Sequence, residues 1–290
     1  MTGSWHERET IVGAGLRLRW RDYPGDAART PVICLPGLTR NCRDFESLAP
    51  HLVSFLGRRV LALDLRGRGR SDHDPEWRNY QLDTYVQDVL AVMDAAALAR
   101  SIIIGTSLGG LIGMHLAALS PVRSAARVAG LVLNDIGPEL DPAGMLRIAT
   151  GVGTARPATS WAEAAADAQK AHATVMPDFN DRDWLTFAQR VYREDSAGRI
   201  VRDMDPNLGR AIRESGSELP DFWGVFAKLE SLPMLCLRGE LSDLLSAATV
   251  ERMAAQHPDL QTCVIPRRGH SPTLDEPASR AAIDAFVRPL

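Results

Sequence analysis

The sequence has little cysteine and no long hydrophobic run. Its 290 residues include four widely spaced cysteines, with no C-x-x-C pair and no histidines at zinc spacing: Cys34, Cys42, Cys236 and Cys263. A chain of this length does not need disulfides to hold a core, so we expect buried thiols in a reducing compartment. No stretch approaches the ~18 apolar residues of a membrane span, and the first residues lack the apolar centre of a signal peptide. These absences predict a cytoplasmic protein without a membrane partner.

A strong excess of charge is also missing. The formal net charge of −3 gives no electrostatic reason to expect nucleic acid as a partner. Arginines do gather in LRGRGRSD (65–72), but glycines separate them and acids flank them, which favours a solvated loop. We find no internal repeat, low-complexity segment or linker. The remaining composition, 45% hydrophobic and 24% charged, is typical of a globular protein.

Short apolar runs indicate a sheet that is buried on both faces. Residues 9–22 alternate around a Gly-Ala-Gly turn and predict an opening hairpin. The later runs show no polar alternation, which favours parallel strands covered by helices. They occupy residues 31–37, 58–67, 101–105, 128–135, 232–239 and 259–266. Helical spacing between them, at 83–99 and 107–119, predicts a doubly wound, mostly parallel α/β fold.

The strand–helix alternation stops between residues 137 and 229. This region is rich in alanine, arginine, aspartate and tryptophan, has helical patterns at 160–175 and 181–195, and offers no strand candidate. We therefore predict a core domain of residues 1–136 and 230–290, interrupted by a helical insertion at 137–229. Two further helices are expected at about 247–256 and 274–287.

A single serine stands between a predicted strand and a predicted helix. Gly105-Thr106-Ser107-Leu108-Gly109 follows the G-x-S-x-G pattern in this strand-to-helix setting. The turn is sharp, so only small residues fit two positions either side of the serine. Ser107 could simply cap its helix, but this context favours a nucleophile if a base is present.

His270 is the best candidate for that base. It lies in a loop between the last predicted strand and the last predicted helix, above the sheet edge that carries Ser107. Five other histidines fall in helical patterns or in the terminus, and surface or core positions are expected for them: His6, His51, His115, His172 and His257. His73 lies in a loop and could border the cleft, but it precedes the serine. A carboxylate should orient the imidazole. Asp243, in GELSD after the penultimate strand, is favoured, and Asp135, in LVLND, is the alternative.

The oxyanion of a tetrahedral intermediate needs two donors. The backbone N–H of Leu108 follows the nucleophile, and the N–H of Leu38 follows the first long strand at a turn that Gly37 permits. The order Ser107, Asp243, His270 is the Ser-acid-His order of α/β-hydrolases.

Over nearly its whole length the chain resembles the α/β-hydrolase superfamily. The motifs are LPGL (35–38), DLRGRGRSD (64–72), GTSLGG (105–110), LRGELSD (237–243) and GHSPTLDEP (269–277). They look most like the capped branch with 3-oxoadipate enol-lactonases, small-ester carboxylesterases and C–C bond hydrolases. Pro36 departs from the histidine that many members have before the glycine. Serine at position 107 disfavours haloalkane dehalogenases and epoxide hydrolases, because resemblance to the former would need an aspartate nucleophile.

The resemblance implies that residues 137–229 form a helical cap over the triad. Apolar cap residues that could line a substrate pocket, or simply form the cap core, are Trp161, Trp184, Phe187 and Trp223. The expected activity is hydrolysis of a small-molecule carboxylic ester or lactone through an acyl-enzyme, with no metal or organic cofactor implied. A C–C bond hydrolase of a vinylogous diketone and a ligand receptor that retains the fold remain alternatives. Oligomeric state is not indicated.

Overall fold

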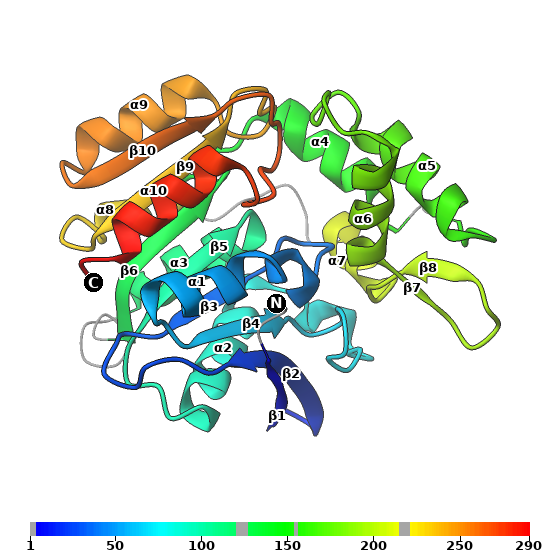
Figure 1. Cartoon of the computed structure of the whole chain (residues 1–290), viewed down its shortest axis with the longest axis horizontal. Helices are drawn as coiled ribbons and strands as arrows, with labels where there is room; N and C mark the ends of the chain where they lie inside the picture. Colours follow the sequence, from blue (N-terminus) through cyan, green and yellow to red (C-terminus); the bar gives the residue numbers. More distant parts are fainter. Residues whose placement is uncertain (1–3, 120–126, 154–155, 215–220) are drawn as a thin grey trace.

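The fold is organised around a twisted eight-stranded sheet (Figure 1). The computed structural model describes residues 4–119, 127–153, 156–214 and 221–290. The strands lie in the order β1-β2-β4-β3-β5-β6-β9-β10. Their bounds are β1 His6–Val12, β2 Leu16–Tyr23, β3 Val32–Leu35, β4 Val60–Asp64, β5 Ser101–Thr106, β6 Val128–Asn134, β9 Met234–Gly239 and β10 Leu260–Ile265. Each of the predicted strands is present.

The fully buried strands of the sheet are parallel, and the antiparallel strands lie at one edge. The hairpin β1–β2 is antiparallel and joins β4 antiparallel at one edge, whereas β4, β3, β5, β6, β9 and β10 run parallel. Strands β3, β4, β5 and β6 are buried at every position. The uninterrupted apolar runs therefore predicted the parallel, doubly covered sheet correctly.

Helices cover both faces of this sheet. On one face lie α1 (Leu48–Leu56) and α10 (Pro277–Val287), which pack against alternate strand residues such as Ile102 and Ile104. On the other lie α2 (Leu82–Ala95), α3 (Leu108–Ala118), α8 (Phe222–Ala227) and α9 (Ala247–Gln256), around residues such as Ile103. Two short 3₁₀ helices, Cys42–Phe45 and Trp77–Asn79, complete the loops. The parallel strands all end at one edge of the sheet, and the loops that follow them lie at that edge.

Between β6 and β9 the chain leaves the sheet and forms the group of elements on the right of Figure 1. They are α4 (Pro142–Gly151), α5 (Trp161–His172), α6 (Asp181–Val191), β7 (Tyr192–Glu194), β8 (Ile200–Arg202) and α7 (Asn207–Glu214). α5, α6 and the hairpin share a small core of their own that includes Trp184 and Ala164. The chain is back on the main core by α8, whose Phe226 packs in the cluster of α3.

The prediction that residues 137–229 contain no strand is wrong. Tyr192 pairs with Arg202 and Glu194 with Ile200 in an antiparallel hairpin, and α6 ends at Val191 rather than continuing to 195. Strands of three residues are too short to show an alternating pattern. This hairpin places Arg202 in the cavity described below.

The four cysteines are free thiols, three of them buried and Cys263 partly exposed. Burial raises the pKa of the Cys34 and Cys236 thiols. In the part of the chain that the structure describes, no helix has the length and apolar character to cross a bilayer.

Candidate active site

Ser107 occupies the sharp turn between β5 and α3. Its φ of 52° and ψ of −116° lie in a region that residues with a side chain rarely adopt. The Ser107 N–H donates to the carbonyl of Asn134 at 3.0 Å, which ties the turn to the end of the neighbouring strand β6. The backbone therefore holds the hydroxyl above the sheet edge.

Gly105 and Gly109 make this turn possible. A Cβ on Gly105 would lie 2.4 Å from the carbonyl carbon of Gly109, and a Cβ on Gly109 would lie 2.2 Å from the Leu35 carbonyl oxygen. Both contacts are with backbone, which cannot move aside. The spacing of the glycines is thus a steric requirement of the turn.

Three side chains form a hydrogen-bonded chain at this edge. His270 Nε2 lies 2.9 Å from Ser107 Oγ, and His270 Nδ1 lies 2.8 Å from Asp135 Oδ2. Asp135 is fully buried and the His270 side chain is 9% exposed. This is the arrangement of nucleophile, base and orienting acid.

Asp135 is fixed by several donors. Its Oδ1 accepts the Gly239 N–H at 2.7 Å, and its Oδ2 accepts the Ser242 hydroxyl at 2.7 Å. Asn134, immediately before it, donates to the Pro272 carbonyl at 2.9 Å and so holds the loop of His270. Residues at or just after the ends of β6 and β9 thus hold both the carboxylate that contacts the imidazole and the loop that carries it.

The expectation that Asp243 pairs with His270 needs correction. Its carboxylate binds the guanidinium of Arg147 on α4, with Oδ2 2.5 Å from Nε and Oδ1 2.8 Å from Nη2. This ion pair holds the pKa of Asp243 below its usual value. Ser242, one residue earlier, faces Asp135, so Asp243 turns to the other side of the loop. Asp135, the alternative, holds the position next to the imidazole.

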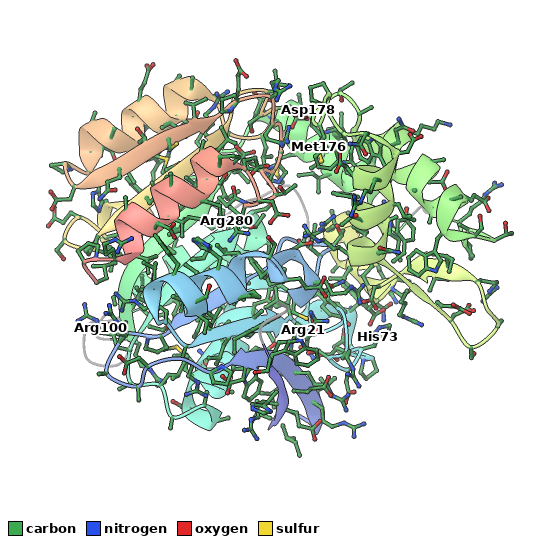
Figure 2. The ribbon with its side chains drawn as sticks, in the orientation of Figure 1. Arg21, His73, Arg100, Met176, Asp178 and Arg280 are labelled. Atoms are coloured by element: carbon green, nitrogen blue, oxygen red, sulfur yellow. The ribbon has the colours of Figure 1, made fainter. Side chains whose placement is uncertain are left out.

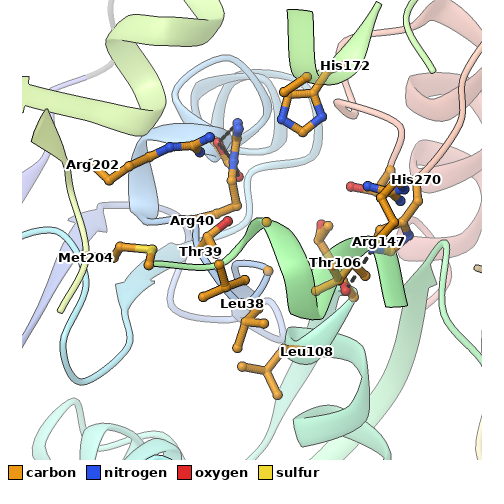
Figure 3. A pocket seen from close by; sticks show the side chains of 18 of the residues that line it. Leu38, Thr39, Arg40, Thr106, Leu108, Arg147, His172, Arg202, Met204 and His270 are labelled. Carbon is orange, nitrogen blue, oxygen red and sulfur yellow. Dashed lines mark hydrogen bonds and ion pairs between the residues drawn. The ribbon is translucent and has the colours of Figure 1, made fainter. Parts of the chain in front are cut away.

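The two predicted oxyanion donors lie beside the nucleophile. Leu38 and Leu108 both line the cavity above Ser107 (Figure 3). Leu108 begins α3, where backbone amides have no intrahelical acceptor. A Cβ on Gly37 would lie 3.7 Å from that of Ser107, so the turn before Leu38 passes close to the hydroxyl. Among the described residues, neither amide has a hydrogen-bond acceptor.

The interpretation of residues 65–72 as a solvated loop is wrong for two arginines. Arg66 and Arg68 are 5% and 0% exposed. Arg66 binds the carboxylates of Asp74 and Asp88. Arg68 Nε donates to the Leu38 carbonyl at 2.8 Å, so it fixes the loop that follows Pro36. The glycines between these arginines therefore mark tight turns around buried side chains and do not indicate a solvated loop.

A cavity of about 1040 Å³ opens at Ser107 and His270. Its walls come from the sheet edge and from residues between 137 and 229, including Ile148, Phe187 and Met204. Phe187 is therefore a lining residue, as predicted. The other three predicted aromatic residues do not line it: Trp161 and Trp184 pack in the small core of α5 and α6, and Trp223 binds Glu139 and Arg252.

His172 also lines this cavity, contrary to the expectation of a surface or ordinary core histidine. Burial, followed by the charges of Arg40, Arg202 and Arg147, lowers the pKa of His172 to about 3. The ring is neutral at ordinary pH. Its position at the end of an alanine-rich helix gave no signal of a pocket. No group of three or more metal-binding side chains occurs among the residues described.

Comparison with known proteins identifies the family of the chain. Residues 30–277 match the family described as the alpha/beta hydrolase fold. The chain belongs to this family. It is 31% identical to the 3-hydroxybutyrate-oligomer hydrolase of Cupriavidus necator, over 96% of this chain and 95% of that protein.

Solved structures of the family are similar as well. The crystal structure of an alpha/beta hydrolase from Novosphingobium aromaticivorans is 42% identical, with a TM-score of 0.92 and complete coverage of both chains. E-2-(acetamidomethylene)succinate hydrolase shares the fold at 22% identity, with a TM-score of 0.80 over 98% of this chain and 99% of that one. The protein is accordingly a hydrolase enzyme.

Proposed function

We propose that this hydrolase cleaves a small-molecule carboxylic ester or lactone through an acyl-enzyme. The observation that carries the proposal is the chain of hydrogen bonds from Asp135 through His270 to Ser107, at 2.8 and 2.9 Å, at the floor of the cavity. Asp135 takes the orienting role first expected of Asp243.

In the first half of the reaction Ser107 Oγ attacks the ester carbonyl carbon while His270 Nε2 accepts the hydroxyl proton. The carbon–oxygen bond to the leaving alcohol then breaks, and the alcohol takes that proton from the imidazolium. In the second half a water molecule gives a proton to His270 and attacks the acyl carbon. The bond from that carbon to Ser107 Oγ then breaks, Oγ takes the proton from the imidazolium, and the acid is released. Asp135 stabilises the imidazolium in both halves.

The amides of Leu38 and Leu108 are proposed to donate to the oxyanion. Support comes from their unpartnered state among the described residues and from the Arg68 contact that holds the Leu38 loop. Residues 137–229 are proposed to act as a cap, because several of them form walls of the same cavity.

Esters of short hydroxy acids are the proposed substrate class. The Cupriavidus necator relative is named for 3-hydroxybutyrate oligomers and spans nearly the whole chain. Oligomers of a hydroxy acid are joined by ester bonds, the bond that this triad chemistry cleaves. The cavity volume of about 1040 Å³ leaves room for a substrate of several hydroxy-acid units.

The test compares the wild type with Ser107→Ala on p-nitrophenyl acetate, butyrate and octanoate. Loss of the nucleophile should lower kcat by at least ~10³-fold. Thr106→Ser, a neighbouring change that keeps a hydroxyl, serves as the control and should retain activity. Equal turnover by the wild type and the alanine variant would contradict the proposal. If no ester is turned over, the C–C hydrolase and receptor alternatives move ahead.

A further inference from the structure

Arg202 is a cation on the cavity wall without a carboxylate partner. It ends strand β8 and lines the cavity, where its guanidinium carbon lies 4.8 Å from the ring centre of Tyr192 on β7. Among the ion pairs of the described residues, none includes Arg202. Burial lowers the pKa of this guanidinium, because removing its charge from water is unfavourable. A bound anion would offset that free-energy cost.

Three other arginines of the cavity wall differ in this respect. Arg40 binds Asp44 with two nitrogens, Arg147 binds Asp243, and Arg190 binds Asp275. Of the acidic residues that line the cavity, Asp44 is therefore already paired. The remaining one, Asp167, is exposed on α5 and acts on Arg202 only through space. Arg156 and Lys170 also line the cavity and form no ion pair with another described residue, but both are exposed, whereas Arg202 is partly buried. Of these three cations, Arg202 is the one held closest to a buried ligand.

The position of Arg202 relative to the triad suits a substrate that spans the cavity. Figure 3 shows Arg202 and Arg40 on one side and His270 on the other. Phe187 lies between the polar groups of that side: Arg40 sits over its ring at 4.3 Å, and the ring of His172 is 5.3 Å away. Burial is the main cause of the low pKa of His172, and the charges of Arg40 and Arg202 lower it further. An apolar chain with a terminal anion matches this arrangement of surfaces.

We infer that Arg202 binds a free carboxylate of the substrate, so that the enzyme prefers an ester carrying a carboxylate over its neutral counterpart. The inference rests on the proposed ester hydrolysis and adds to it the chemical class recognised away from Ser107. Arginine suits a carboxylate because its planar guanidinium offers two parallel donors. Arg202 is a specificity residue in this scheme and takes no part in the bond-breaking steps.

The experiment uses two substrates of equal shape, 3-(butanoyloxy)butanoate and its primary amide, with wild type, Arg202→Gln and Arg199→Gln. Arg199 lies in the same hairpin, binds Asp195 and is not part of the cavity wall, so it provides a matched control. Wild type and Arg199→Gln should favour the carboxylate in kcat/KM. Arg202→Gln should lose ~10- to 100-fold on the carboxylate, the size of one charged contact, and change little on the amide.

A second readout does not depend on which half of the ester carries the anion. 3-Hydroxybutyrate should inhibit hydrolysis of p-nitrophenyl butyrate more strongly than 3-hydroxybutanamide does, and Arg202→Gln should remove that difference. Ester hydrolysis that depends on Ser107, with no carboxylate preference in either assay, would overturn the role of Arg202 and leave the proposed function standing. An equal loss on carboxylate and amide would overturn it too, since that result indicates a structural role. Absence of Ser107-dependent ester hydrolysis would instead refute the proposed function.

Discussion

The sheet edge and the inserted segment 137–229 build their parts of the site in different ways. At the edge, Ser107 and Asp135 follow adjacent parallel strands, and a backbone hydrogen bond joins Ser107 to Asn134. Their separation is therefore set by strand register. The inserted segment instead brings its residues from separate helices and a short hairpin, and only α5, α6 and the hairpin share a small core of their own.

Ion pairs are prominent where the inserted segment meets the sheet domain. Arg147 binds Asp243, Arg190 binds Asp275, and Asp178 binds Arg268 in the loop before His270. Figure 2 labels Asp178 near the junction of the two regions. Pairs that are partly exposed contribute little each. Substitutions at the edge should therefore abolish the chemistry, whereas substitutions in the segment should change which substrate is accepted.

The two carboxylates near His270 give the sharpest form of this comparison. Asp135→Asn should lower kcat by ~10³- to 10⁴-fold, because the orienting carboxylate no longer stabilises the imidazolium. Asp243→Asn, which weakens only the contact with Arg147, should lower it by less than ~10-fold. Measurement of kcat and KM on p-nitrophenyl butyrate checks both. A larger loss in Asp243→Asn than in Asp135→Asn would show that the resting geometry misidentifies the acid.

Substitutions of two glycines, one at the sheet edge and one in the inserted segment, should differ in their effect on stability. In Gly109→Ala the new methyl group would meet the Leu35 carbonyl, and we expect a loss of ~1–3 kcal/mol or more in the free energy of unfolding. Gly151 ends α4 in the inserted segment, and a Cβ there meets nothing within 4 Å. Gly151→Ala should be neutral or stabilise by up to ~1 kcal/mol. Urea unfolding followed by tryptophan fluorescence measures both, and equal effects would refute the steric account of the turn.

The same contrast explains what the sequence could and could not predict. Apolar runs gave the strands, and the glycines around Ser107 signalled a sharp turn, because both are local consequences of backbone geometry. His270 could be found because its loop follows the last strand of the same edge. These features need no knowledge of distant side chains.

The choice between the two candidate acids depended on side chains that are distant in the sequence. Asp135 and Asp243 both follow strands that end at the same edge, and the loop GELSD, which projects past that edge, wrongly favoured Asp243. The difference lies in Arg147, 96 positions from Asp243, which binds that carboxylate. Arg202 was not singled out for a related reason: its strand has only three residues, and its proposed role depends on the lack of an ion pair with another described residue.

A smaller effect is expected from the ion pair between Arg147 and Asp243. The pKa of Asp243 is lowered in the folded state, so the pair stabilises the protein above the unfolded pKa of about 3.9 and is lost as the pH falls through the folded value. Both side chains are about a third exposed, which limits the contribution to ~0.5 kcal/mol. The Tm of Arg147→Gln should lie slightly below that of wild type near neutral pH.

That difference in Tm should shrink as the pH is lowered toward the folded pKa of Asp243. Arg182→Gln is the control, because Arg182 is exposed on α6 and forms no ion pair with another described residue. Its difference from wild type should stay constant over the same range. If the difference in Tm between wild type and Arg147→Gln grew as the pH fell, this ion pair could not be its cause.

The smallest expected effect concerns His172, the other histidine of the cavity wall. Its pKa of about 3 keeps the ring neutral throughout the range in which the enzyme would be assayed, from about pH 5 to pH 8. His172→Gln should therefore leave the shape of the profile of kcat/KM against pH unchanged, whatever it does to KM. His51→Gln is the matched control, because His51 binds Asp284 and is not among the residues that line the cavity. A shift of the acidic limb in His172→Gln alone would mean that the inserted segment contributes a titrating group to the chemistry, and the division between edge and segment would fail.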